Sequence, residues 1–161
     1  MLVGIDLRGR RVLVAGAGTV AGRRVRRLLD EGAEVVVVAP VLGDGALVEL
    51  VSAEAVVWHQ RRVEHPDVWG SWLVLAATDD PAVNDEVSRW AHAAGVWCIN
   101  ASDVEAGSAR MAAISRHDGL LVGVVSQAGA DPARVMAVRD ALAAHIDSGT
   151  VDLRRRRSRR R

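Results

Sequence analysis

The stretch that decides the fold is RVLVAGAGTVA, residues 11–21. It begins as a short, mostly apolar run of the kind that forms a buried parallel strand, and it ends in a segment with apolar residues at helical spacing. Between them lies the pattern G-x-G-x-x-A, formed by Gly16, Gly18 and Ala21. A strand, a glycine-rich turn and a helix in this order are typical of a dinucleotide-binding unit.

Each position of this pattern has a physical role in that interpretation. Gly16 permits the tight turn, Gly18 lets the main chain approach a pyrophosphate, and Ala21 allows the helix to pack closely on the sheet. The start of the helix supplies amide donors and the positive end of its dipole. The alternative interpretation is a glycine-rich turn that binds no ligand.

The second strand lacks the acid that usually binds the adenosine ribose. That acid is expected about 20 residues beyond the glycine pattern, but the strand ends in Val38-Ala39-Pro40-Val41. We therefore expect main-chain groups around Pro40 and Val41 to hold the ribose. Since no basic residue stands there for an extra phosphate, we expect NAD rather than NADP.

The sequence up to residue 103 alternates between strand and helix periodicities. Strands are predicted at 11–15, 34–39, 55–58, 72–77 and 96–99, with helices at 20–31, 44–53 and about 80–94. This alternation implies right-handed crossovers and a parallel sheet that is covered on both faces. The predicted fold class is α/β, with a Rossmann-like NAD-binding domain in residues 1–103.

The pattern changes after residue 103. Two strands are predicted at 110–115 and 120–125 around a turn at 117–119, followed by an amphipathic helix at 131–146 with an apolar stripe. Two strands and a helix are too little for an independent core. We expect residues 104–147 to form a small α+β dimerisation and substrate segment that packs against a second copy of the chain. Residues 148–161 are predicted to be a basic, disordered tail.

Composition places the chain among globular proteins. Of its 161 residues 50% are hydrophobic and 25% are charged, and no apolar run is long enough to cross a bilayer. The N-terminus does not have the pattern of a signal peptide, so we expect a cytoplasmic protein. The one cysteine, Cys98, excludes a disulfide framework, and no metal ligands are predicted, because the five histidines show no metal-ligand spacing. The five tryptophans are expected in the core.

The net charge of +1 is unevenly distributed. Seven of the 21 basic residues lie in 154–161, so residues 1–153 carry a net charge of −6. The basic run could bind a polyanion or serve as a linker, but a solvated tail is the preferred interpretation. Nucleic-acid binding is not predicted.

Four segments carry a resemblance to a known family. They are 6–14 before the glycine pattern, 36–40 at the end of the second strand, 75–80 with Asn84, and 126–132 before the last helix. Together they resemble the precorrin-2 dehydrogenase and sirohydrochlorin ferrochelatase family, the N-terminal module of siroheme synthases. Its most specific part is Ala76-Ala77-Thr78-Asp79-Asp80 with Asn84, a string that a generic Rossmann protein does not need.

The resemblance implies NAD-dependent oxidation of precorrin-2 to sirohydrochlorin in siroheme biosynthesis, and in some members insertion of iron. By position, Thr19, Val20, Pro40 and Val41 fall where the family contacts NAD. Together with Gly16, Gly18 and Thr78 they form the predicted set of cofactor-binding residues. The resemblance also implies a tetrapyrrole substrate, a homodimer with an intertwined second segment, and a uroporphyrinogen-III methyltransferase as a fused or separate partner.

The family has a catalytic aspartate just after the fifth strand, where this chain reads Cys98-Ile99-Asn100-Ala101-Ser102-Asp103. With Cys98 fixed, Ser102 takes the aspartate position. With Asn100 as the anchor, Asp103 does. Of these two side chains, only the carboxylate of Asp103 can act as a general base or, in a chelatase, help to hold an incoming metal. We therefore predict Asp103 as the catalytic residue, against the alternative of a solvated loop acid.

Two rival functions stay open at this point. One is a regulatory module that binds NAD without chemistry, although such modules usually have an acid at the end of the second strand. The other is a family member that binds a tetrapyrrole but no longer oxidises it, which Ser102 would explain.

Overall fold

The computed structural model describes residues 2–127 and 129–153. It consists of two compact units, the first ending at Arg110 and the second beginning at Met111. Of the predicted tail at 148–161, residues 154–161 lie outside the described residues. Within the described part, no helix is long and apolar enough to cross a membrane.

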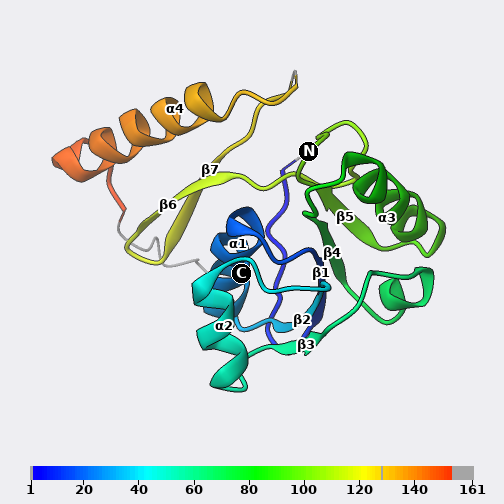
Figure 1. The fold of residues 1–161 in the computed structure, drawn as a ribbon. Helices are drawn as coiled ribbons and strands as arrows, with labels where there is room; N and C mark the ends of the chain where they lie inside the picture. Colours follow the sequence, from blue (N-terminus) through cyan, green and yellow to red (C-terminus); the bar gives the residue numbers. More distant parts are fainter. Residues whose placement is uncertain (1, 128, 154–161) are drawn as a thin grey trace, which may run out of the picture. The chain divides into compact units, whose positions relative to one another are not determined.

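The first unit contains a parallel five-stranded sheet (Figure 1). Its strands, in chain order, are β1 (Arg11–Ala15), β2 (Glu34–Val38), β3 (Val57–His59), β4 (Leu73–Ala76) and β5 (Trp97–Asn100). They lie in the order β3-β2-β1-β4-β5. The helices are α1 (Thr19–Asp30), α2 (Gly45–Ser52), α3 (Pro81–Ala93) and the short 3₁₀ helix η1 (His65–Val68). The predicted α/β Rossmann-like fold is confirmed.

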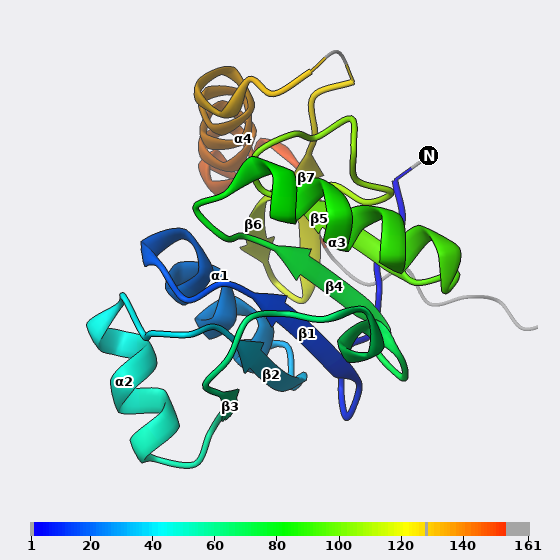
Figure 2. The ribbon, with the colours of Figure 1, turned by 45° about the vertical axis from the view of Figure 1, so that its right-hand side comes forward.

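Strand β1 is apolar throughout its interior because both faces of the sheet are covered. Leu13 and Ala15 pack in one core cluster with Val87 and Ala91 of α3. Neighbouring strand residues point to the opposite face, and the residues that alternate with Leu13 and Ala15 are also fully buried. Helix α1 packs on β1 and β2, and α3 packs on β4 and β5, as Figure 2 shows.

The order of the strands creates a point where the chain changes direction across the sheet. From β1 the chain proceeds to β2 and β3 on one side, and only later to β4 on the other. The segments that follow β1, β4 and β5 therefore meet at one edge. The Ala77 amide donates to the Ala15 carbonyl (2.8 Å), and the Ala101 amide donates to the Ala76 carbonyl (2.8 Å). Open α/β sheets bind ligands at such a switch point.

The second unit is a hairpin with one helix. Strands β6 (Ala113–His117) and β7 (Leu120–Val124) are antiparallel, and α4 (Pro132–His145) contacts both before the short π-helix η2 (Ile146–Thr150). Asp118 and Gly119 form the turn with positive φ angles of 43° and 78°, which is the combination that two-residue hairpins favour. No residue of α4 is buried.

Two sequence-based expectations were wrong in detail. The first hairpin strand occupies 113–117 rather than 110–115, because the turn needs only Asp118 and Gly119. His117 was expected in the turn, but it ends β6 and is buried, with ring nitrogens 2.9 Å from Asp147 Oδ1 and 2.9 Å from Ser115 Oγ.

Three of the five tryptophans were also misplaced. Trp69, Trp72 and Trp97 are each about half exposed, not buried in the core. Trp72 precedes β4 and Trp97 begins β5, so both lie at the end of the sheet opposite to the switch point. The Arg10 guanidinium lies 3.9 Å from the centre of the Trp72 ring, a cation–π arrangement that suits a half-exposed indole.

Candidate functional site

The glycine loop is closed on one side by main chain and open on the other. Gly16 has a φ of +104°, and a Cβ added there would lie 2.3 Å from the Ala77 carbonyl oxygen. No side chain larger than that of glycine fits this turn. A Cβ added at Gly18 would meet nothing within 4 Å, so the main chain at Gly18 can be approached closely from outside.

The start of α1 has the properties of an anion site. Gly18 is the N-cap, no side chain caps the helix, and its first turn holds no acid. The first amides of a helix have no partner within it, so those of Thr19 and Val20 are suited to a phosphate. The residues present therefore fit the pyrophosphate of a dinucleotide, as the sequence predicts.

The loop after β2 lies next to the glycine loop, because the Gly43 amide donates to the Ala17 carbonyl (3.0 Å). Val41 is largely exposed there. The indole of Trp58 donates to the Ala39 carbonyl (2.9 Å), which occupies one main-chain group beside Pro40. The assignment of Pro40 and Val41 to the ribose stays a prediction, with both residues at the expected edge of the sheet.

Helix α1 also carries an arginine that the sequence analysis did not single out. Among the described residues, Arg24 Nη1 is buried and has no hydrogen-bond partner. Burial, together with the neighbouring charges of Arg23 and Arg27, lowers the pKa of Arg24. A guanidinium in this state attracts an anion, such as a phosphate or a carboxylate. Its signal in the sequence was an arginine on the border of the buried face of the helix.

Thr78 is held by Asn84 at the end of β4. The Thr78 amide donates to Asn84 Oδ1 (2.9 Å), the Thr78 hydroxyl lies 2.8 Å from the same oxygen, and Asn84 Nδ2 donates to the Thr78 carbonyl (3.1 Å). Asn84 is only 1% exposed. The polar groups of Thr78 therefore fix the loop, and the predicted contact of Thr78 with a cofactor stays a prediction.

The loop after β5 holds both candidates for the catalytic position. Asn100 Oδ1 accepts from the Ser102 amide (2.9 Å), the Ser102 hydroxyl (2.8 Å) and the Asp103 amide (3.0 Å). The Ser102 hydroxyl also accepts from Asn84 Nδ2 (3.0 Å). The structure thus brings Thr78, Ser102 and Asp103 together at the switch point, through two asparagines whose roles the sequence analysis missed.

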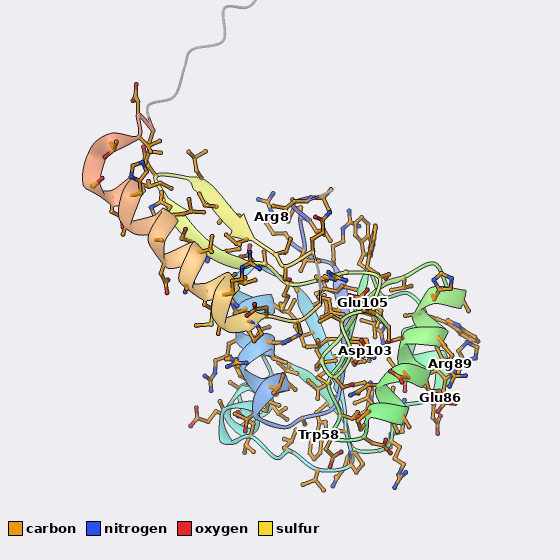
Figure 3. All side chains as sticks on the ribbon, turned by 90° about the horizontal axis from the view of Figure 1, so that it is seen from above. Arg8, Trp58, Glu86, Arg89, Asp103 and Glu105 are labelled. Carbon is orange, nitrogen blue, oxygen red and sulfur yellow. The ribbon has the colours of Figure 1, made fainter. Side chains whose placement is uncertain are left out.

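Asp103 itself presents its carboxylate at the surface of this loop. Asp103 Oδ1 accepts from the Glu105 amide (2.9 Å), which orients the side chain. Glu105 in turn pairs with Arg110, with Nη2 and Oε1 2.5 Å apart. Figure 3 shows Asp103 next to α3, the helix that carries Glu86 and Arg89.

Side chains of the types that bind metals, Cys98 included, form no metal centre among the described residues. There, no three His, Cys, Asp or Glu side chains gather closely enough to hold a metal ion. Cys98 is buried, and burial raises the pKa of its thiol. A buried, protonated thiol is a small core side chain rather than a nucleophile.

Several known proteins are similar to this chain in sequence. A family described as "Putative NAD(P)-binding" matches residues 3–113. The precorrin-2 dehydrogenase of Bacillus subtilis is 32% identical over 129 residues, which cover 80% of this chain and 77% of the relative. A siroheme synthase of Azotobacter vinelandii is 41% identical over 135 residues, covering 83% of this chain but only 29% of the relative.

A solved structure shares the fold as well. The precorrin-2 dehydrogenase SirC superposes with a TM-score of 0.73 and 28% identity, covering 90% of this chain and 70% of that one. The chain spans only 26–29% of the length of three relatives, a probable multifunctional siroheme biosynthesis protein and two siroheme synthases. These matches confirm the predicted family and its NAD(P)-binding character.

Proposed function

Because this chain belongs to the precorrin-2 dehydrogenase family, as its sequence predicted, we propose that it oxidises precorrin-2 to sirohydrochlorin with NAD as the electron acceptor. One observation carries the proposal. The glycine loop, Thr78 and Asp103 all lie on segments that meet at the switch point of the sheet. A cofactor with its pyrophosphate on Gly16 to Val20 would therefore extend toward a carboxylate.

The chain's own residues have separable tasks in this proposal. The main chain of the glycine loop binds and orients the dinucleotide, with Pro40 and Val41 beside its adenosine end. When bound, NAD accepts a hydride, which is the chemistry that the protein cannot supply. Asp103 takes the proton that the substrate releases with the hydride, or orients the ring for that loss.

Asp103 fits this task better than Ser102. The single hydroxyl hydrogen of Ser102 is donated to Asn100 Oδ1, and its oxygen accepts from Asn84. A neutral hydroxyl is a far weaker base than a carboxylate, and the one proton that Ser102 could release is engaged by Asn100 Oδ1. The carboxylate of Asp103, in contrast, lies at the exposed surface of the loop.

The test is turnover of precorrin-2 by the purified protein with NAD, followed by the absorbance of NADH. We expect Asp103→Asn to lower kcat by about 100-fold, the lower range of general-base effects, with little change in NAD affinity. Glu86→Gln removes an exposed carboxylate from α3 and is the matched control. Binding of NAD without NADH formation in the wild type would instead favour the non-catalytic binding module.

Iron insertion is a second activity that the same protein can be tested for. Sirohydrochlorin and ferrous iron, incubated with the protein, would give the absorbance of siroheme if Asp103 also helps to hold the incoming ion. Unchanged spectra with active dehydrogenase would separate the two activities.

We also propose that the protein is a cytoplasmic homodimer, supplied with substrate by a uroporphyrinogen-III methyltransferase. The support is in the second unit, where α4 has no buried residue and large apolar side chains of β7 and α4 are exposed. A hairpin and one helix cannot bury enough apolar surface to be stable alone. Sedimentation over a range of concentrations tests the dimer, and a monomer at all concentrations contradicts it.

A further inference from the structure

Two buried amides connect the loops that follow β4 and β5. Asn84 and Asn100 are only 1% and 2% exposed. The oxygen of each amide faces one loop, Thr78 for Asn84 and Ser102–Asp103 for Asn100. Burial of a polar group costs free energy unless the group is hydrogen-bonded. The bonds of these two amides offset that cost and fix the loops that they contact.

The orientation of both amides follows from their partners. The Thr78 amide faces Asn84 Oδ1, and the amides of Ser102 and Asp103 face Asn100 Oδ1. A main-chain N–H can only donate, so the atom facing it must be the amide oxygen. The nitrogen of Asn84 is therefore directed toward Ser102, at 3.0 Å from its hydroxyl oxygen.

The Ser102 hydroxyl is the direct link between the two amides. It donates to Asn100 Oδ1, which can only accept, and it accepts from Asn84 Nδ2, which can only donate. The hydrogen bonds therefore run in one direction, with Asn84 donating to Ser102 and Ser102 donating to Asn100. Reversal of this direction would place two donors or two acceptors against each other.

The second amide is anchored to helix α3. Asn100 Nδ2 donates to Asp85 Oδ1 (3.0 Å) and to Ser88 Oγ (3.2 Å). The Ser88 hydroxyl lies 2.9 Å from the Asn84 carbonyl oxygen. The loop after β5 is thereby tied to the same helix that carries Asn84, so the two loops cannot move independently without breaking buried bonds.

We propose that Asn84, Ser102 and Asn100 form a positioning clasp that sets Thr78 and Asp103 at one fixed separation. For its catalytic meaning this inference rests on the proposed function, in which those two loops flank the reacting atoms. Ser102 is then a positioning residue and not a replacement for the catalytic aspartate. The clasp acts by holding Asp103 through its main chain, which leaves the carboxylate exposed.

Amide hydrogen exchange measures the clasp without any substrate. Asn100→Ala removes the acceptor of the Ser102 and Asp103 amides, and we expect both to exchange about tenfold faster, as the loss of one hydrogen bond to each implies. Ser71→Ala is the matched control, because it truncates a buried serine that is bonded to Arg11 and to neither asparagine of the clasp. Exchange in that variant should stay at the wild-type rate.

Turnover shows whether the clasp positions Asp103. Ser102→Ala removes only the link, and we expect kcat to fall about tenfold while the Kd for NAD changes by less than about threefold. Ser102→Thr keeps the hydroxyl and should restore kcat. Since the Ser102 side chain is exposed, these variants should fold even if Asn100→Ala does not.

Two results would overturn the clasp. One is unchanged exchange of the loop amides in both Asn100→Ala and Ser102→Ala. The other is a loss of kcat in Ser71→Ala as large as in Ser102→Ala, which would indicate general loss of packing. A wild-type protein that binds NAD but forms no NADH would defeat the proposed function alone, and the exchange rates would still decide whether the clasp exists.

Discussion

The two units of this chain differ in how much of their own apolar surface they bury. In the first, the interior of the sheet is closed on both faces, and Leu13 is fully buried. In the second, the predicted apolar stripe of α4 is only partly covered, with Val138 42% and Leu142 41% exposed. The first unit therefore has its own core, whereas the second needs an apolar partner, which we propose to be a second copy.

The largest expected effect is the difference in unfolding free energy between one truncation in each unit. Leu13→Ala removes a buried side chain from β1 and should cost about 3 kcal/mol of unfolding free energy, from lost transfer energy and the cavity left behind. Leu121→Ala removes an exposed side chain of β7 and should change the unfolding free energy of the monomer by less than about 0.5 kcal/mol. Urea titration at low protein concentration provides both values. Equal losses would erase the difference between the units.

The next largest effect is expected at Gly16, with Gly149, which also has a positive φ, as its comparison. Gly16→Ala should cost about 2 kcal/mol, because it combines a strained φ with a clash against the Ala77 carbonyl. It should also abolish detectable NAD binding in calorimetry. Gly149 in the second unit has a φ of +78° but nothing within 4 Å of an added Cβ, so Gly149→Ala should cost less and leave NAD affinity unchanged.

Gly18→Ala is the control for the ligand itself. Its φ is −81°, and an added Cβ meets no protein atom, so thermal unfolding should be nearly unchanged. The methyl group would point into the space assigned to the pyrophosphate, and NAD affinity should fall by at least about tenfold. Normal affinity in this variant would move the dinucleotide away from the glycine loop.

The sequence predicts well the part of the fold whose apolar residues are buried against other residues of the same unit. The apolar run 11–15 and the glycine pattern specify β1, its turn and α1, because their periodicity reflects a core made by the same unit. The first strand of the hairpin was misplaced at 110–115, since few of its residues are buried and its pattern is weak. The set of site residues was incomplete for another reason. Asn84 and Asn100 act through contacts between loops far apart in the chain, and a single sequence does not show such contacts.

The proposed dimer predicts a concentration-dependent effect in the second unit only. Val138→Asp places a charge on the exposed apolar part of α4, and it should raise the dissociation constant of the dimer by about tenfold or more, because a charge in an apolar interface loses its hydration. Sedimentation equilibrium measures this change. Glu86→Gln, on an exposed face of the first unit, is the control and should leave the dimer intact. An unchanged dissociation constant in Val138→Asp would place the interface elsewhere.

The smallest effect is a dependence on alkaline pH that belongs to the first unit alone, since the one cysteine lies there. Burial raises the pKa of Cys98 above its ordinary value of 9.0 in the folded state. The folded protein then binds this proton more tightly than the unfolded chain, so the stabilisation is complete below the unfolded pKa and is lost as the pH rises above it. Unfolding free energies at about pH 8 and about pH 10 should differ less in Cys98→Ala than in the wild type. If both proteins lost the same free energy, the alkaline sensitivity would come from another group, and the thiol would be more accessible than the closed core of the first unit allows.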